Sequence, residues 1–172
     1  MCDSRYRITN VVAKWPGSTN GSRILSHSNI GREFENGNKQ GILIGDSGYP
    51  LKPWMMTPFA TPQTPAKVGY NRAHPRTRVF IEQVNGQLKM KFPCLIAGLR
   101  VSPKQACRII VACAVLFNLA KEMMEPDHEA NDLPDDPPVN DYQGDPRPAA
   151  LAVRAQIATD HFNRQRAQEN IN

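Results

Sequence analysis

Two acidic residues in a basic part of the chain are the candidates for chemistry. Asp46 ends the apolar run in GILIGDSGYP, and Glu82 lies in RVFIEQ. A carboxylate at the edge of a buried strand is costly to desolvate unless something binds it. Two-metal phosphoryl chemistry needs convergent carboxylates, because Mg²⁺ and Mn²⁺ prefer hard oxygen ligands. A turn aspartate in Asp-Ser-Gly is the structural alternative for Asp46.

Basic side chains surround these carboxylates in the sequence. Positive charge keeps a carboxylate ionised, which suits a metal ligand. If the segment is helical, Glu82 and Lys89 share one face, because seven residues make about two turns. The residues expected to contact phosphate or to orient the carboxylates are Arg72, His74, Arg76, Arg78 and Lys89. A solvated basic face is the alternative interpretation.

The net charge of +5 conceals an asymmetry along the chain. Residues 1–121 carry 17 Lys and Arg against 5 Asp and Glu, a net of +12, and residues 122–172 carry 4 against 11, a net of −7. A basic body indicates a polyanionic partner, usually nucleic acid, although anionic membranes and acidic proteins fit the charge equally.

Cysteine usage and hydropathy narrow the class of protein. The four cysteines form no CxxC pair, which indicates reduced thiols in an intracellular protein. The longest apolar run, IIVACAVLFNLA, is shorter than a bilayer span, so we expect a soluble protein without a membrane partner.

The elements that must position these residues follow from periodicity and punctuation. Strands are predicted within 5–15 and, buried on both faces, at 41–46. A short helix followed by a loop is predicted at 22–37. Six prolines predict an irregular connection over 50–75, in which Trp54, Met55, Met56 and Phe59 pack back on the core.

The C-terminal third contains two predicted helices and an acidic linker. A helix is predicted over 102–124, with Ser102 as N-cap, Pro103 at the first position and Gln105 completing a capping box. Residues 125–148 are acidic and proline-rich, typical of a disordered linker. A second amphipathic helix is predicted over 149–168. The expected apolar face of the first helix comprises Ala106, Ile109, Ile110, Cys113, Leu116, Phe117 and Ala120.

The segment 78–92 admits two interpretations. Asn85-Gly86 between partly alternating runs favours a β-hairpin. Ile81, Val84 and Leu88 favour one face of a helix, which must carry a glycine at a cost of about 1 kcal/mol. We predict a helix, because the resemblance described next also favours it.

Four segments together resemble the PIF/Harbinger-type DDE transposases and the nucleases derived from them. These are VVAKWPGSTNGSRIL, GILIGDSGYPLKPWMMTPF, YNRAHPRTRVFIEQVNGQLKMKFPCL and IIVACAVLFNLAKE, in family order over roughly residues 2–124. The resemblance implies an RNase H-like α/β domain in which three or four acidic residues hold Mg²⁺ or Mn²⁺ for DNA cleavage and joining. It also implies DNA as partner, a transposon-derived DNA-binding partner protein, and a nuclear location, with the cytoplasm as a second one.

The resemblance assigns roles residue by residue. Asp46 matches the second family aspartate and Glu82 the family glutamate, so both are the expected catalytic residues and metal ligands. Lys89 matches the basic residue seven positions later. The motif before the glutamate, with an expected role in orienting it or in contacting phosphate, is matched by Tyr70, Asn71, His74 and Arg78.

Several family positions differ in this chain. The strand that carries the first family aspartate is absent, and Asn20 and Gly21 replace a histidine and an aspartate of the family pattern. Lys67, Asn85 and Phe117 also replace usual family residues, and Asp3 is a conceivable but unfavoured substitute ligand. We therefore expect impaired catalysis and marginal stability, because neighbouring strands lose their partner.

These inferences combine into one prediction. The fold class is α/β: an incomplete RNase H-like domain over 1–124 that lacks its first strand, an acidic linker over 125–148 and a C-terminal helix over 149–172. The function is that of a transposase-derived, divalent-metal-binding DNA nuclease-like protein with impaired catalysis. The alternative is a non-catalytic DNA- or protein-binding remnant with a basic body and an acidic tail.

Overall fold

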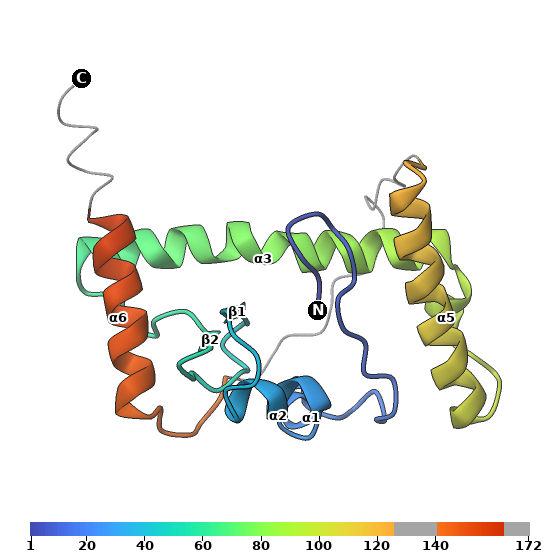
Figure 1. Cartoon of the computed structure of the whole chain (residues 1–172), viewed down its shortest axis with the longest axis horizontal. Coiled ribbons are helices and arrows are strands. Elements are labelled where there is room, and N and C mark those ends of the chain that lie inside the picture. Colours follow the sequence, from blue (N-terminus) through green and yellow to red (C-terminus); the bar gives the residue numbers. More distant parts are fainter. Residues whose placement is uncertain (126–140, 164–172) are drawn as a thin grey trace. The chain divides into compact units, whose positions relative to one another are not determined.

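The computed structural model describes residues 1–125 and 141–163 (Figure 1). In chain order the elements are α1 (Gly21–Ser26), α2 (Asn29–Glu35), β1 (Leu43–Ile44), β2 (Met55–Met56), α3 (Pro65–Lys91), α4 (Cys94–Ala97), α5 (Pro103–Glu122) and α6 (Pro148–Phe162). The chain divides into two compact units. Within the described residues, unit 1 comprises 1–19 and 79–125, and unit 2 comprises 20–78 and 141–163.

The architecture is mixed helical with a small parallel sheet. β1 pairs with β2 in the register Leu43 to Met55 and Ile44 to Met56. The RNase H-like details of the predicted fold stay a prediction.

The strand predicted at 41–46 is shorter and more exposed than expected. Only Leu43 and Ile44 form β1, and the prediction of burial on both faces is wrong, because Ile42 is 52% and Ile44 43% exposed. In the described part of the chain β1 pairs with β2, and no other strand there pairs with its second edge.

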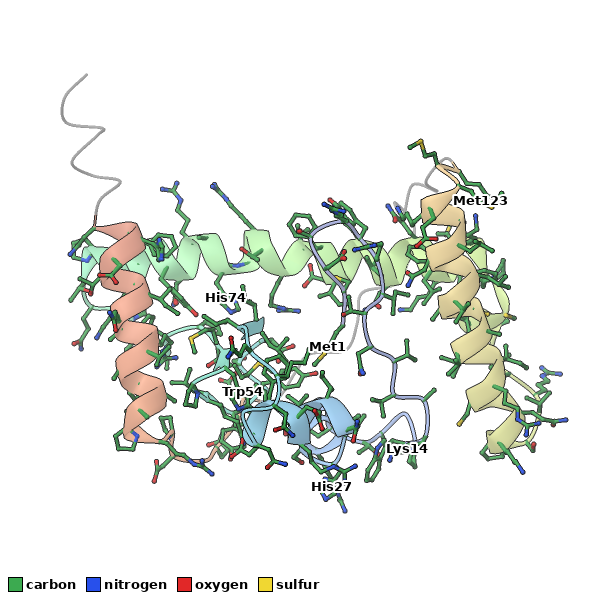
Figure 2. The ribbon with its side chains drawn as sticks, in the orientation of Figure 1. Met1, Lys14, His27, Trp54, His74 and Met123 are labelled. Carbon is green, nitrogen blue, oxygen red and sulfur yellow. The ribbon has the colours of Figure 1, made fainter. Side chains whose placement is uncertain are left out.

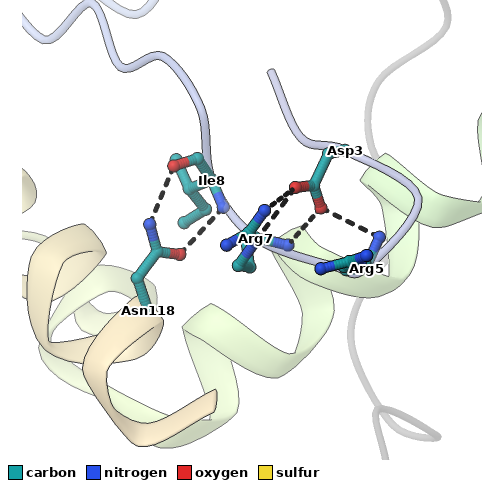
Figure 3. A network of polar contacts seen from close by, with 5 residues as sticks. All are labelled: Asp3, Arg5, Arg7, Ile8 and Asn118. Atoms are coloured by element: carbon teal, nitrogen blue, oxygen red, sulfur yellow. Dashed lines mark hydrogen bonds and ion pairs between the residues drawn. The ribbon is translucent and has the colours of Figure 1, made fainter. Parts of the chain in front are cut away.

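Residues 5–15 do not form the predicted strands. A single bridge joins Cys2 and Ile8, and the intervening loop turns back at Tyr6, whose φ is 60°. Asp3 organises this loop: its Oδ1 accepts hydrogen bonds from the backbone N–H groups of Arg5 and Arg7, at 2.9 and 3.0 Å (Figure 3). The local side-chain bonds compete with strand pairing, which explains the difference.

Residues 22–37 form two helices in place of the predicted helix and loop. Asn20 caps α1 by accepting a hydrogen bond from Ser22 N at 2.8 Å, and Ser28 caps α2 by accepting one from Gly31 N at 3.0 Å. The second cap explains why the chain resumes a helix after Ser26.

The proline-rich connection is shorter than predicted, because β2 lies within it and α3 begins at Pro65. Met55 and Met56 are buried, as expected for residues that pack back on the core. Phe59 packs against the buried cluster of unit 2.

Helical predictions in the second half are confirmed. Residues 78–91 belong to α3, not to a hairpin. α5 begins with the expected capping box at Ser102 and Gln105 and with Pro103. Its buried residues are Cys113, Ala114, Phe117 and Ala120, whereas Leu116 is 50% exposed, so the predicted apolar face was wrong at that position.

The length and apolar composition of α5 are those of a helix that could span a membrane. With 20 residues, α5 is long and apolar enough to cross a bilayer by length and composition alone, whereas the expectation of a soluble protein rested on the shorter apolar run within it. Core helices of soluble proteins satisfy the same two criteria.

Unit 2 buries its core between α6, α3 and the segment 51–59, which contains β2. The buried residues are Leu51, Met56, Tyr70, Ala150 and Ala158. α6 and α3 approach closely where a Cβ on Gly69 would lie 3.2 Å from Phe162 Cβ. The predicted helix at 149–168 is confirmed to Phe162; the rest of it, and most of the predicted linker, lie outside the described residues.

Candidate functional site

Asp46 follows β1 by two residues and is held in a tight turn. Its Oδ1 accepts a hydrogen bond from Gly48 N at 2.9 Å, and Tyr49 N donates to its backbone carbonyl at 3.2 Å. The interpretation of Asp46 as a turn residue is therefore confirmed. Its carboxylate is only partly buried. The strand delivers Asp46 to the point where the chain reverses.

Arg78 is the charged partner of Asp46 within unit 2. Its Nη2 lies 3.8 Å from Asp46 Oδ2, at side-chain exposures of 28% and 19%. At this separation and partial exposure the pair contributes modestly to stability. The Arg78 guanidinium would repel a cation bound to the same oxygen, Asp46 Oδ2.

His74 lies on α3 next to the same turn and is buried (Figure 2). Its Nε2 is 3.5 Å from the Met56 carbonyl oxygen. Burial lowers the pKa of His74 below its usual 6.5, and nearby Arg78 lowers it further, against the opposing effects of the Met56 and Gly45 carbonyls and of the Asp46 carboxylate. The imidazole is thus neutral near pH 7 and suited to holding the backbone of β2 and β1.

Tyr49 and Gly21 complete the surroundings of Asp46. Burial raises the pKa of Tyr49, and the Asp46 carboxylate adds to the shift. A Cβ on Gly21 would lie 2.7 Å from Tyr49 Oη. The position at which the family pattern has an aspartate is therefore in contact with the Asp46 turn, and Tyr49 occupies the space that a longer side chain needs.

The other members of the family motif in unit 2 have different surroundings. Tyr70 is buried in the core. Asn71 binds both backbone groups of Phe59: Asn71 Oδ1 accepts a hydrogen bond from Phe59 N at 2.9 Å, and Asn71 Nδ2 donates one to Phe59 O at 2.8 Å. Arg72 and Arg76 are exposed, four residues apart on α3. Exposed, unshielded guanidinium groups of this kind suit phosphate contact.

Glu82 and Lys89 lie in α3 as predicted, seven residues apart, but in unit 1. Glu82 is exposed and Lys89 half-buried. The structure thus groups Asp46, His74 and Arg78 within unit 2, and the convergence of Asp46 with Glu82 stays a prediction.

Asp3 is committed to its own loop in unit 1. Its Oδ2 also pairs with Arg7, 3.0 Å from both Nε and Nη2 (Figure 3). Burial raises the pKa of Asp3, but hydrogen bonds from Arg7 and Arg5 outweigh that effect and lower it. With both oxygens engaged, Asp3 is poorly placed to act as a substitute metal ligand.

The donor set can be tested against the metals that the family uses. Among residues 1–125 and 141–163, no group of three or more His, Cys, Asp or Glu side chains is placed to hold one ion. A two-metal centre needs several convergent carboxylates. The donors in the described part of the chain therefore do not fit such a centre.

Arg154 is an important residue of unit 2 that the sequence interpretation missed. Its Nη1 donates to the carbonyls of Thr57 and Pro58, at 3.2 and 2.8 Å, and its guanidinium lies 4.1 Å from the centre of the Phe59 ring. The available signal was a lone arginine in the apolar run AALAVRAQIA, since a charge within a buried face requires partners.

Comparison with known proteins identifies a family model and several relatives that match this chain. The family model described as DDE superfamily endonuclease matches residues 1–118. The chain is 39% identical over 126 residues to "Putative nuclease HARBI1" of Bos taurus and equally to that of Homo sapiens, covering 71% of this chain and 36% of each relative. It is 28% identical over 140 residues to "Protein ALP1-like" of Arabidopsis thaliana, covering 72% of this chain and 34% of that protein.

The chain spans about a third of the length of the curated relatives that it matches. No solved structure matches it.

Proposed function

This chain belongs to the DDE superfamily endonucleases of Harbinger type, and we propose that it is a nuclease-derived, DNA-binding protein with impaired cleavage. The single observation that carries the proposal is the Asp46–Arg78 pair. Asp46 matches a family metal ligand, and its carboxylate already has a cationic neighbour, Arg78, and a backbone hydrogen-bond donor, Gly48 N. These two partners stabilise the negative charge that a bound metal ion would otherwise stabilise.

Weak binding of one hydrated Mg²⁺ or Mn²⁺ ion at Asp46 is part of the proposal, and Glu82 stays the second candidate metal ligand of the chain. Two carboxylates cannot position a pair of metals, and an ion at Asp46 must also displace Arg78 or tolerate it. Cleavage of a phosphodiester requires stabilisation of charge that develops on both the attacking and the leaving oxygen. A site with this donor set lacks that capacity.

Binding of DNA is supported by the charge of the basic body. Residues 1–121 carry a net charge of +12. Arg72 and Arg76 are exposed on one face of α3, near the residues that match the family motif. Guanidinium groups contact phosphate oxygens with two parallel hydrogen bonds, and each contact releases bound counterions. We propose that these two arginines contact the DNA backbone and that the protein acts in the nucleus.

A plasmid-nicking assay with Mn²⁺, together with DNA binding measured at several salt concentrations, tests this function. We expect salt-sensitive binding and no nicking above the metal-only background. The double variant Arg72→Ala/Arg76→Ala should flatten the slope of log K against log salt by about 2, since each phosphate contact contributes about 0.9. Arg100→Ala, at another exposed arginine, is the control. Its slope of log K against log salt should stay closer to that of the parent protein than the slope of the double variant does.

Two results would overturn the proposal. Mn²⁺-dependent nicking that Glu82→Gln and Asp46→Asn each abolish would establish an active nuclease. Absence of salt-sensitive DNA binding would remove the DNA-binding function, whatever the nicking result.

A further inference from the structure

The outward face of α5 carries an apolar stripe bounded by opposite charges. α5 belongs entirely to unit 1. Val111, Val115 and Leu119 succeed one another at four-residue spacing and are 44%, 61% and 48% exposed. Apolar side chains spaced by one helical turn form a continuous strip, and exposed strips of this kind mark interaction surfaces.

The charges at the two ends of the stripe are symmetrically placed. Arg108 lies seven residues before Val115, and Glu122 lies seven residues after it. Both are exposed. Seven residues are about two helical turns, so all three side chains lie on the same face of α5.

We propose that this face binds a second copy of the chain through antiparallel pairing of α5 about a two-fold axis at Val115. In that arrangement Val115 meets its own copy, Val111 meets Leu119, and Arg108 meets Glu122 at both ends. A two-fold interface places the same surface patch on both partners, and the stripe is complementary to itself when one copy is reversed.

Charge fixes the direction of the pairing. In a parallel pair the Arg108 side chains would face each other, as would the two Glu122 side chains. Like charges in contact oppose association, whereas two opposite pairs favour the antiparallel register. The exposed Met123 at the end of α5, 67% exposed (Figure 2), extends the apolar surface beyond Glu122.

The expected association is weak. A single pair of helices covers less surface than the roughly 1,200–2,000 Å² of a standard stable interface. We therefore expect a dimer with a dissociation constant of about micromolar order or weaker, visible as a concentration-dependent sedimentation coefficient.

Sedimentation velocity of the full chain over a concentration series tests the proposal. Arg108→Glu and Glu122→Arg should each weaken the dimer about tenfold or more, because each places like charges opposite one another. The charge-swapped double variant Arg108→Glu/Glu122→Arg should restore association to near the parent level. Arg100→Glu makes the same charge change at an exposed site outside α5 and should have no such effect.

The design separates this inference from its alternatives. Circular dichroism of each variant reports whether the chain remains folded, and restoration in the double variant cannot arise from misfolding. A monomer at every concentration would overturn the proposal, as would a dimer that the charge changes leave intact. Cosedimentation with phosphatidylcholine–phosphatidylserine vesicles in place of self-association would show that the apolar stripe binds a membrane instead.

Discussion

Asn118 and Ile8 form a paired hydrogen bond across 110 positions of the sequence. Asn118 Oδ1 accepts from Ile8 N at 2.8 Å, and its Nδ2 donates to Ile8 O at 2.8 Å (Figure 3). One side chain on α5 thus satisfies both backbone groups of a residue that has only an isolated bridge for pairing. It substitutes for a neighbouring strand in anchoring the first segment of unit 1.

Asn118→Ala should destabilise unit 1 by about 1–3 kcal/mol, because both Ile8 backbone groups lose their partner in a partly buried position. Urea denaturation and amide exchange at Ile8 measure the effect. Asn118→Asp is the matched variant: it keeps the acceptor for Ile8 N and loses the donor to Ile8 O. Undiminished exchange protection at Ile8 in the alanine variant would refute the anchoring role.

His74 should make unfolding pH-dependent. Because burial lowers its pKa below 6.5, the unfolded state binds more protons than the folded state between the two pKa values. The stabilisation is complete above pH 6.5 and is lost as the pH falls from there through the folded-state pKa. The urea midpoint of unfolding, measured from pH 7.5 to 5, reports this loss of stability. His74→Gln, whose side chain cannot titrate, should show a smaller decline in the midpoint than the control His27→Gln, at an exposed site. An equal decline in both variants would contradict the prediction.

Arg154 should stabilise unit 2 through its contacts with the segment after β2. Arg154→Met keeps much of the apolar volume but leaves the Pro58 carbonyl without its donor and the Thr57 carbonyl with the Tyr70 hydroxyl alone, at an expected cost of about 1–3 kcal/mol. Arg76→Met, at an exposed position of the same unit, is the control and should change stability by less than about 0.5 kcal/mol. Equal denaturation midpoints for the two variants would be inconsistent with this role.

Gly31 should tolerate no side chain. A Cβ there would overlap the Leu25 carbonyl oxygen, a backbone atom that cannot move without disturbing the end of α1. Gly31→Ala should therefore cost about 1–3 kcal/mol. Gly17→Ala meets nothing within 4 Å and should be neutral or slightly stabilising. Thermal unfolding of both variants, followed by circular dichroism, makes the comparison, and similar melting temperatures would show that α1 and α2 adjust.

Local signals in the sequence determined the start of α5 and the family. The capping box at Ser102 with Pro103 predicted the start of α5, because a helix needs donors satisfied at its first turn and these residues satisfy them locally. The motifs around Asp46 and Glu82 identified the nuclease lineage, since motif matching depends only on residue order.

Only the tertiary structure decided which residues pair with Asp46 and what surrounds the apolar segments. The run at 41–46 predicted a buried strand, but burial depends on neighbours that the run itself does not contain, and Ile42 and Ile44 are exposed. The Asp46–Arg78 pair and the contact of Gly21 with Tyr49 join segments separated by 32 and 28 positions. Such contacts are fixed by packing across the unit, for which local periodicity carries no information.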